Sequence, residues 1–276
     1  MATFNQLSAW VGRTAVVIDA PHCGSHYPPD FDFACDFRAL RKAEDTHCDS
    51  LWNFAPGLGA AFVTADFART YMNLNADLAA VTALLRDGAW PHELQDDEEG
   101  VLVARRLDDG TSIYARELTV HEVQARLGRC WLPYHTSLAS AVEAAYRRHG
   151  HVLHLNCYSM PSLGPKRTDG TRAVNPDMLL CDGDGQTADS GIAQAIAGFL
   201  EDKGYMVGLN SPCKSLQLIR RHGGPRDGRH SLQVLVNKRL YMDEDSLDLH
   251  RGLLTTRRAL MDMTELIVRG EVAAMR

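Results

Sequence analysis

The chain has 276 residues and a mass of 30.5 kDa, which is enough for one large domain or two small ones and excludes a mini-protein held together by a metal or by disulfides. Hydrophobic residues make up 45% and charged residues 23%, as in ordinary globular proteins, so long disordered or fibrous segments are excluded as well. The formal net charge of -6 argues against a nucleic-acid or anionic-membrane binder, because those proteins need a basic field, and favours a small-molecule partner.

No apolar run approaches the ~20 residues of a transmembrane helix, and Met1–Gly12 lacks the basic start and apolar centre of a signal peptide. We therefore expect a cytoplasmic protein. The 7 cysteines are scattered and form no Cys-x-x-Cys pair, so neither a disulfide framework nor a zinc ribbon is predicted. We expect most of the cysteines to be small buried residues.

The first half of the chain begins with a predicted buried strand, Thr14–Ala20, which is short, apolar and rich in β-branched residues. The loop Pro21–His26 leaves this strand, and ligands bind at such strand ends in open α/β sheets. Asp36–Leu58 has helical periodicity, and Ala60–Thr64 is predicted to be a second strand. Leu85–Thr111 is polar and turn-rich, which favours a solvated loop, with a substrate lid as the alternative.

A long helix is predicted to begin at Thr119 and to end at Gly150. Thr119-x-x-Glu122 is a capping-box pattern, an apolar stripe follows it, and Pro133 predicts a break. The later elements are the strand Val152–Cys157, the loop Tyr158–Ser162, the strand Met178–Cys181, the helix Asp189–Lys203, the strand His230–Val236 and the helix Leu247–Val268.

Strands and helices alternate along the whole chain. This order predicts an α/β fold with a central mixed or mostly parallel sheet, flanked by helices on both faces, of the phosphorylase or hydrolase type. The sequence has neither an internal repeat nor a linker rich in Pro, Gly or Ser, so we expect a single domain over residues 1–276.

Polar residues gather at three predicted strand exits and on the first predicted helix. Asp45 and Asp49 are four residues apart and would share one face of that helix. Carboxylates and imidazoles that converge at one end of a sheet can bind Zn²⁺, which keeps an open fourth position when it is catalytic. The alternative for each histidine is an ordinary hydrogen-bonded imidazole. The residues at the strand exits are His22 with His26, Tyr158 with Ser159, and Arg220 with Arg221 and His222.

Other catalytic templates fit poorly. The sequence has no Gly-x-Gly-x-x-Gly after the first strand, no Walker A motif and no Gly-x-Ser-x-Gly elbow. Cys23 adjoins His22, but neighbouring side chains in an extended loop point apart, which argues against a Cys–His nucleophile.

Several stretches together resemble the N-formylglutamate amidohydrolase family, whose members are similar to zinc carboxypeptidases in fold and hydrolyse an amide on an acidic amino acid. The stretches follow the family order over about residues 14–245. They are Pro21–Pro28, Asp45–Trp52, Trp131–His135, His154–Ser162, Pro176–Leu180, Arg220–Gly223 and Arg239–Glu244.

The resemblance implies metal-assisted hydrolysis, in which Zn²⁺ polarises the carbonyl and acidifies a bound water while a glutamate moves the proton. His22 would be the first zinc ligand and Asp45 the second. The third position, where the family has Asp-x-His-Ser, is occupied here by Tyr158. A phenol must lose its proton to bind a metal well, so this exchange would weaken zinc affinity.

Further positions depart from the family pattern. The late Gln-x-Glu appears as Gln233-Val234-Leu235, so Leu235 occupies the position of the expected glutamate and the catalytic residue is unidentified. Asp-x-Asn-Arg ends in Ala76, and the Asn-Gly-Arg before the basic segment ends in Pro212. Each of these two motifs loses an arginine, the residue best suited to a substrate carboxylate.

Two functions follow as hypotheses. The first is a metal-dependent amidohydrolase that acts on an N-acyl amino acid or a similar small amide, with His135, Arg220, Arg221 and His222 as candidate substrate-binding residues. The alternative is a catalytically degenerate relative that binds a metabolite or a partner protein in the former active site. The oligomeric state stays open.

A third possibility is that neighbouring residues replace the lost groups. Glu44 adjoins Asp45, and His154 shares a strand face with Tyr158. His154 would lie about 13 Å deeper along the strand, so we interpret it as a core histidine. All of these interpretations require His22, Asp45 and Tyr158 to meet at the carboxyl edge of the sheet, within about a dozen ångströms of one another.

Overall fold

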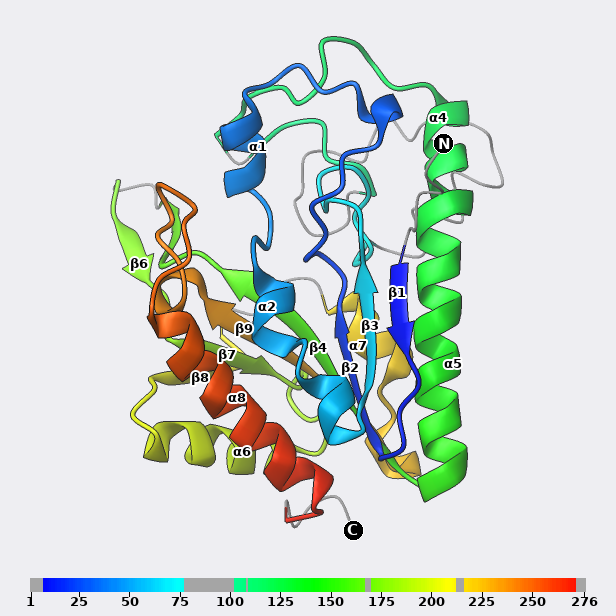
Figure 1. Ribbon diagram of the computed structural model, residues 1–276, viewed down its shortest axis with the longest axis vertical. Helices are drawn as coiled ribbons and strands as arrows, with labels where there is room; N and C mark the ends of the chain where they lie inside the picture. Colours follow the sequence, from blue (N-terminus) through cyan, green and yellow to red (C-terminus); the bar gives the residue numbers. More distant parts are fainter. Residues whose placement is uncertain (1–6, 77–101, 108, 167–169, 212–215, 272–276) are drawn as a thin grey trace.

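A mixed sheet of 7 strands forms the centre of the molecule (Figure 1), as the computed structural model describes it for residues 7–76, 102–107, 109–166, 170–211 and 216–271. The order across the sheet is β1-β3-β2-β4-β9-β7-β8. The central neighbours β3, β2, β4 and β9 are parallel, whereas β1 is antiparallel to β3 and β7 is antiparallel to β9. The bounds are β1 (Leu7–Trp10), β2 (Val16–Ala20), β3 (Ala61–Ala65), β4 (Val152–Met160), β7 (Met178–Cys181), β8 (Val207–Leu209) and β9 (Arg229–Asn237).

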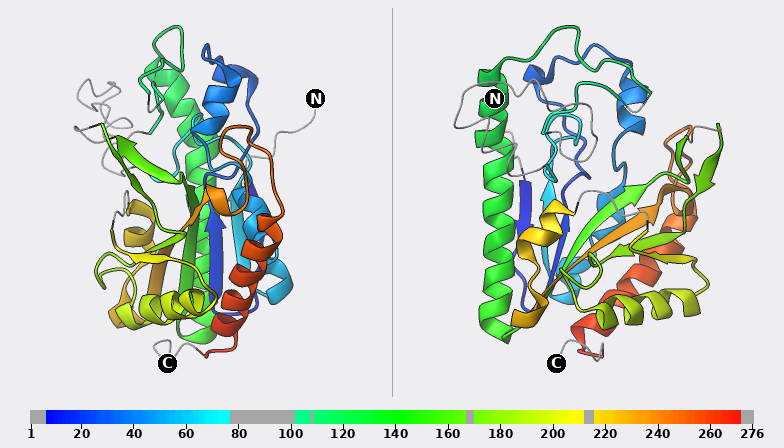
Figure 2. Two further views of the ribbon diagram at one scale, coloured as in Figure 1. Left: turned by 90° about the vertical axis from the view of Figure 1, so that its left-hand side faces the viewer. Right: turned by 180° about the vertical axis from the view of Figure 1, so that it is seen from behind.

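Helices cover both faces of this sheet. The helices α2, α6 and α8 pack on one face, while α5 and α7 pack on the other, which Figure 2 presents to the viewer in its right-hand view. The predicted α/β fold is therefore confirmed. The helix bounds are α1 (Phe37–Lys42), α2 (Cys48–Trp52), α4 (Val120–Arg126), α5 (Leu132–His149), α6 (Ser190–Asp202), α7 (Gln217–His222) and α8 (Gly252–Val268), and a separate ribbon pairs β5 (Leu163–Lys166) with β6 (Arg172–Val174).

The two faces of the sheet differ in polarity. Side chains alternate along a strand, so Leu153, Leu155 and Cys157 of β4 join the apolar core beneath α2, α6 and α8. The intervening His154, Asn156 and Tyr158 project to the opposite face, where α5 and α7 pack. His154 and Asn156, both fully buried, therefore form a polar patch on this face of the sheet.

The predicted helix Asp36–Leu58 is wrong as a single element. It divides into α1, α2 and a 3₁₀ turn at Ala55–Leu58, and His47 adopts a left-handed φ of 63° before α2. The break is stabilised from far along the chain, because the Lys238 ammonium donates to the Glu44 carbonyl at 2.6 Å and to the Lys42 carbonyl at 3.2 Å. The turn places Asp45 between helices, buried, and leaves Asp49 exposed, so the two carboxylates do not share a site.

Three other boundaries differ from the predictions. Tyr158–Ser162 is not a free loop, because β4 stays paired with β9 as far as Met160. Arg220–His222 is the end of the short helix α7 rather than a strand exit. The last helix begins five residues later than predicted, because Asp243 accepts the amides of Asp245 and Ser246 in a turn and Leu247 has a φ of 66°. Most of the predicted loop Leu85–Thr111 lies outside the described residues.

The long helix has a wide turn near its start. The capping box at Thr119 and Glu122 and the stop at Gly150, with φ 74°, are confirmed. At the expected break the chain forms a π-helical turn, Leu127–Trp131, and continues into α5. A proline lacks the amide for the usual bond and crowds the carbonyl four residues before it, so a wider turn ahead of Pro133 accommodates it.

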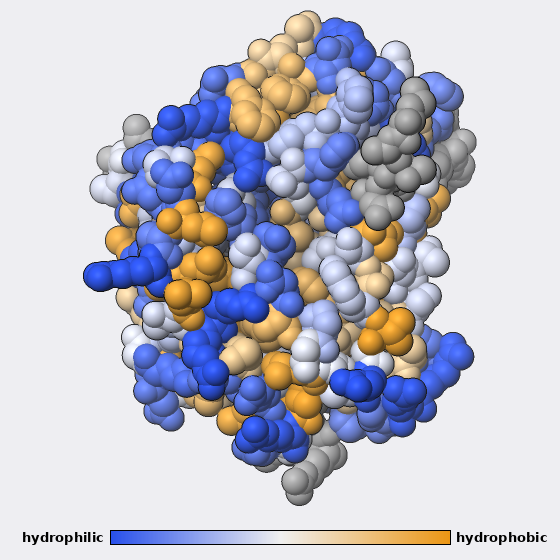
Figure 3. All heavy atoms as spheres, in the orientation of Figure 1, coloured by the Kyte–Doolittle hydropathy of each residue, from blue (hydrophilic) through white to orange (hydrophobic). Residues whose placement is uncertain are grey.

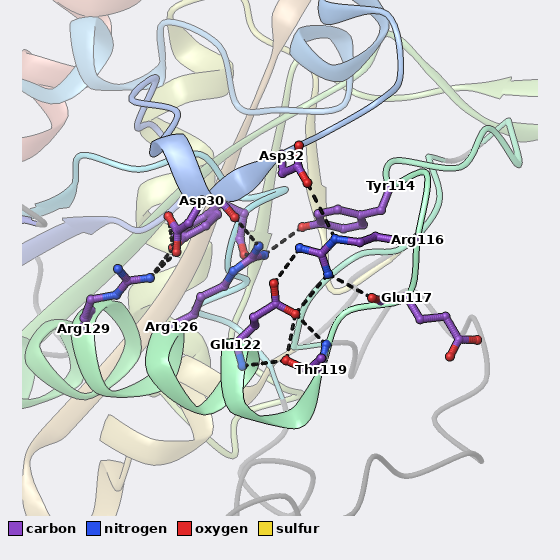
Figure 4. Close-up of polar contacts among 10 residues, drawn as sticks. Asp30, Asp32, Tyr114, Arg116, Glu117, Thr119, Glu122, Arg126 and Arg129 are labelled. Atoms are coloured by element: carbon purple, nitrogen blue, oxygen red, sulfur yellow. Dashed lines mark hydrogen bonds and ion pairs between the residues drawn. The ribbon is translucent and has the colours of Figure 1, made fainter.

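A buried arginine joins the start of this helix to two other segments (Figure 4). The Arg126 side chain is fully buried and donates to the Tyr71 carbonyl at 3.1 Å, the Tyr114 hydroxyl at 2.8 Å and the Asp30 carbonyl at 3.2 Å. Its guanidinium carbon also lies 4.2 Å from the centre of the Tyr71 ring. Arg129 pairs with the Asp30 carboxylate beside it. The cluster therefore fastens the segments around residues 30, 71 and 114 to α4.

Replacing Arg126 with methionine is expected to lower the free energy of unfolding by about 3 kcal/mol, because three oxygen acceptors lose a charged donor. Urea denaturation followed by circular dichroism measures the change. Arg148→Met, at an exposed position near the end of α5, is the matched control and should stay within about 0.5 kcal/mol of the wild type. A loss of similar size in both variants would show that the cluster has no special role.

The cysteines follow the expectation with one exception. Cys23, Cys48, Cys130 and Cys157 are buried free thiols. Cys181 is disulfide-bonded, which the scattered spacing of the cysteines did not predict.

The outer surface mixes charged and apolar side chains. Figure 3 shows hydrophobic residues in several separate groups among hydrophilic ones on the face seen in Figure 1. Among the described residues, no helix combines the length and the apolar character needed to cross a bilayer.

Candidate functional site

Three of the predicted site residues meet at the carboxyl edge of the parallel strands. His22 follows β2 directly, Tyr158 lies near the end of β4, and Asp45 is in the turn between α1 and α2. His22 Nδ1 lies 3.6 Å from Asp45 Oδ2, and the rings of His22 and Tyr158 have centres 5.0 Å apart in an edge arrangement. The three side chains therefore form one buried cluster, well within the separation that the sequence analysis required.

The hydrogen bonds of His22 define its tautomer. Asn73 Oδ1 accepts the amide of Asn75 at 2.9 Å, so this oxygen also accepts the Nε2–H of His22, at 3.0 Å. Burial lowers the pKa of His22 below its ordinary value, although Asp45, which lies beside Nδ1, favours the protonated ring. The ring nitrogen and the carboxylate oxygen face each other, so the pair can share a proton or place two lone pairs near a cation.

Asp45 is held as a carboxylate. Burial opposes its ionisation, but His22 and the positive charges of Lys238 and Arg69 outweigh burial and lower the pKa of the carboxyl. Ser159 donates its hydroxyl to the second oxygen, Asp45 Oδ1, at 2.8 Å. The side chain retains 11% exposure, so it is not fully sealed from solvent.

Glu44 does not offer a free base beside Asp45. One of its oxygens accepts from the Tyr27 hydroxyl at 2.6 Å and from Arg41 at 3.1 Å, and the other accepts from the Thr70 hydroxyl at 2.8 Å. Because both oxygens are engaged, Glu44 joins the loop after β2 to the turn that follows β3 and acts as a structural group.

Tyr158 and Leu235 lie directly opposite each other. They are register partners on the adjacent strands β4 and β9, so the two residues that depart most from the family pattern are neighbours on one face. Burial raises the pKa of Tyr158 well above its ordinary value, so the phenol keeps its proton. Leu235 has no group that can move a proton, and the pair therefore supplies neither a good metal ligand nor a base.

The donor set at this cluster does not fit the zinc ion that the family implies. A catalytic zinc site takes three protein ligands, drawn from histidine, cysteine and acidic side chains, whereas His22 and Asp45 supply two. In the part of the chain that the structure describes, no group of three or more His, Cys, Asp or Glu residues could hold a metal ion. The protonated phenol of Tyr158 does not make up the third ligand.

A second polar cluster lies deeper on the same face of the sheet. Asp19 accepts from the Tyr134 hydroxyl at 2.7 Å, from His154 Nε2 at 2.9 Å and from Asn156 at 2.8 Å. His154 Nδ1 lies 2.7 Å from the Ser231 hydroxyl, and no part of the His154 side chain is exposed. His154 is therefore the core histidine that its depth predicts, and it does not face the edge of the sheet.

The remaining substrate-binding candidates lie on α5 and α7. His135 donates Nε2–H to the Leu74 carbonyl at 2.9 Å and accepts from Arg221 at 2.9 Å, and Arg221 also packs over the Trp131 ring. His222 is buried with its ring against His154, at 5.4 Å between centres. Arg220 and His26 are exposed. Arg220, Arg221 and His222, which the sequence groups as candidate substrate-binding residues, therefore have different surroundings.

The two buried histidines are expected to make the fold acid-sensitive. Burial lowers the pKa of His135 to about 3 and that of His222 to about 3. Between these values and the ordinary 6.5, the unfolded chain binds more protons than the folded chain, so stability is lost as the pH falls through this range. Each histidine should cost about 1.4 kcal/mol at pH 5.5.

Urea denaturation at pH 7.5 and pH 5.5 measures this loss. His222→Gln should remove about 1.4 kcal/mol of the difference between the two pH values. His121→Gln, at an exposed position of α4, should leave the difference unchanged. An unchanged pH dependence in His222→Gln would contradict the assignment.

Several residues of the site carry no sequence signal that points to them. The sequence shows Asn73 only as a departure from the Asp-x-Asn-Arg motif, yet it accepts from His22. Lys238 and Arg69 belong to no motif of the sequence, although both charges act on Asp45. Of the two positions that lose the family arginine, Ala76 is buried, and Pro212 lies outside the described residues.

The comparisons with known proteins agree with this architecture. A family model for N-formylglutamate amidohydrolase matches residues 14–242. The chain is 27% identical over 265 residues to an N-formylglutamate deformylase of Pseudomonas aeruginosa, covering 92% of each chain, and 27% identical over 247 residues to one of Pseudomonas putida, covering 86% of this chain and 85% of the relative.

Solved structures extend this result. A crystal structure of N-formylglutamate amidohydrolase from Ralstonia eutropha superimposes with a TM-score of 0.86 at 36% identity, over 96% of this chain and 97% of the other. A gene product of Agrobacterium tumefaciens shares the fold, with a TM-score of 0.67 at 14% identity over 98% and 96% of the two chains. The sequence stretches, the sheet and these matches together place the chain in the N-formylglutamate amidohydrolase family.

Proposed function

We propose that this protein binds a small N-acyl amino acid, or a similar small amide, at the cluster of His22, Asp45 and Tyr158, and that it does not hydrolyse this ligand with zinc. One observation carries the proposal: Tyr158 and Leu235 stand opposite each other at the positions of the expected third ligand and the expected glutamate. Loss of a general base alone typically removes ~10²–10⁴-fold of rate, and here the metal ligand is lost as well.

The unpaired polar atoms support an amide ligand. Among the described residues, the buried Tyr158 hydroxyl and Asn156 Oδ1 make no well-formed hydrogen bond, although the Tyr158 and Asn156 side chains lie close enough to interact. Asn156 gives its amide group to Asp19, so its free oxygen is an acceptor, whereas the phenol is a donor. Leaving such atoms unpaired costs ~1–3 kcal/mol each. A secondary amide offers a carbonyl oxygen to the phenol and an N–H to the Asn156 oxygen, so it complements both.

The relatives support the same class of ligand. Those that resemble this chain over nearly its full length are named for N-formylglutamate, which is an N-acyl amino acid with two carboxylates. The second candidate function is hydrolysis of such an amide. It is favoured by the His22 and Asp45 pair, because a ring nitrogen and a carboxylate oxygen that lie 3.6 Å apart can pass a proton or bind a cation.

Calorimetric titration with N-formyl-L-glutamate and an assay of formate release, each with and without added Zn²⁺, separate these functions. We expect binding without zinc and no formate. Turnover that needs zinc and disappears in His22→Ala would overturn the proposal in favour of hydrolysis. The absence of any binding would overturn both functions for this ligand.

A further inference from the structure

The segment that follows β9 is bonded to the turn that carries Asp45. Lys238 is the first residue after this strand and is only 7% exposed. Its ammonium group donates to the Glu44 carbonyl at 2.6 Å. Three residues further on, the hydroxyl of the buried Tyr241 donates to the Thr46 carbonyl at 3.1 Å. The main chain is therefore held immediately before and immediately after Asp45.

A buried ammonium group fits the end of α1. The last carbonyls of a helix have no partner inside the helix, and a lysine side chain can satisfy them. Lys238 does this for two of them, because it also donates to the Lys42 carbonyl at 3.2 Å. Burial lowers the pKa of Lys238, since an ammonium group that leaves water loses its hydration. The two carbonyls replace part of that hydration, so the bonds to the turn explain why a lysine is tolerated there.

Both side chains extend from a fixed piece of main chain. Asn237 caps the 3₁₀ turn after β9 by accepting the Arg239 amide at 3.1 Å. The Tyr241 amide donates to the Lys238 carbonyl at 3.1 Å, which closes the same turn. Lys238 and Tyr241 therefore reach the Asp45 turn from one rigid support at the end of the sheet.

The neighbouring strand holds the carboxylate of the same residue. Ser159 of β4 donates to Asp45 Oδ1 at 2.8 Å, and Asp45 Oδ2 lies 3.6 Å from His22 Nδ1. The strands β4 and β9 are adjacent and parallel, so Ser159 and Lys238 lie at the same edge of the sheet. One strand thus fixes the carboxylate, and the segment after the other fixes the main chain on both sides of it.

We infer that Lys238 and Tyr241 are positioning residues, which hold the main chain around Asp45 so that its carboxylate stays beside His22. The inference rests on the proposed function and adds to it the residues that keep the binding site in shape. Both residues act through Asp45. A hydrogen bond weakens steeply when its distance or angle is wrong, so a turn that moves will weaken the binding of a ligand at Asp45.

Two amides of the described chain report directly on this turn. The Cys48 amide donates to the Asp45 carbonyl at 3.1 Å, and the Ser50 amide donates to the His47 carbonyl at 3.1 Å. Amide hydrogen exchange measures how often such bonds open locally, and it needs no ligand.

Lys238→Met tests the inference, because methionine keeps most of the length of the side chain without its donors. The Cys48 and Ser50 amides should exchange about 10-fold faster than in the wild type, while the amides between β4 and β9 keep their rates. Tyr241→Phe should give a smaller increase, about 2- to 5-fold. Arg239→Met is the matched control, because Arg239 lies in the same 3₁₀ turn but pairs with Asp177 at 2.8 Å. It should leave both amides unchanged.

Titration with N-formyl-L-glutamate adds the readout of function. The Kd should rise about 10-fold in Lys238→Met and about 2- to 5-fold in Tyr241→Phe. Arg239→Met should leave the Kd unchanged. Arg126→Met should also leave it unchanged, because that variant loses stability at a cluster outside the site, so it shows what a structural loss alone does.

The two readouts separate this inference from the proposed function. Unchanged exchange of the Cys48 and Ser50 amides in Lys238→Met, or faster exchange throughout the sheet, would overturn the positioning role. Faster local exchange with a Kd within about twofold of the wild type would also overturn it and would leave the proposed function intact. If the wild type does not bind N-formyl-L-glutamate, the proposed function fails, and the exchange rates alone decide whether Lys238 holds the turn.

Discussion

Replacing Tyr158 with histidine and Leu235 with glutamate in one chain is expected to create a zinc site. The two positions are register partners, so the new imidazole would join His22 and Asp45 while the new carboxylate lies beside it. Elemental analysis after dialysis should find roughly one zinc per chain in the double variant and far less in the wild type. Formate release from N-formyl-L-glutamate should rise by about 10²-fold or more above the wild-type background.

The single variants are the controls for this result. Tyr158→His alone should bind zinc without appreciable turnover, because the base is still missing. Leu235→Glu alone should bind no zinc and should be less stable than the wild type, because it places a carboxylate without a partner in a partly buried position. Stoichiometric zinc in the wild-type protein would contradict the whole argument, since it would mean that His22 and Asp45 suffice.

The second large effect is expected at Asp19. Asp19→Ala should lower the free energy of unfolding by about 3–5 kcal/mol, because it leaves three buried donors, on Tyr134, His154 and Asn156, without their acceptor. This loss is a large share of the ~5–15 kcal/mol that stabilises an ordinary domain. Urea denaturation measures this loss. Recovery of the variant only as insoluble protein would also agree with a loss of this size.

Asp49→Ala provides the matched control, because Asp49 is an exposed carboxylate with no comparable set of donors. It should change the free energy of unfolding by less than about 0.5 kcal/mol. A change below about 1 kcal/mol in Asp19→Ala would mean that the three donors find other acceptors, and the deep cluster would then have no stabilising role.

The sequence predicted the inner strands of the central sheet, because these are short apolar runs bounded by turn residues, but it missed the edge strands β1 and β8. The strands β2, β3, β7 and β9 begin and end within about two residues of the expected bounds. The meeting of His22 and Tyr158 follows from the same source, since the carboxyl ends of parallel strands lie at one edge of a sheet. The local sequence pattern therefore predicts the position of a site residue when that residue lies at the end of a strand.

Contacts between distant residues explain the failures. The break in the predicted helix Asp36–Leu58 depends on Lys238, which is 194 residues beyond the Glu44 carbonyl that it binds. The pairing of Tyr158 with Leu235 depends on the register of β4 and β9, which spacing along one strand does not reveal. Tyr158 and Leu235, which are far apart in the sequence, therefore alter the same place in the structure.

The π-helical turn at Leu127–Trp131 changes the direction in which the side chains of the long helix point before and after it. One residue advances an ordinary helix by about 100°, so a wider turn shifts the angular phase of everything that follows it. Arg126, before the turn, is aimed at the segment around Asp30, whereas Tyr134, after it, is aimed at Asp19 in the sheet. The helix can therefore contact the segment around Asp30 with one part and the sheet with the other. A uniform α-helix of the same sequence could not orient both side chains correctly.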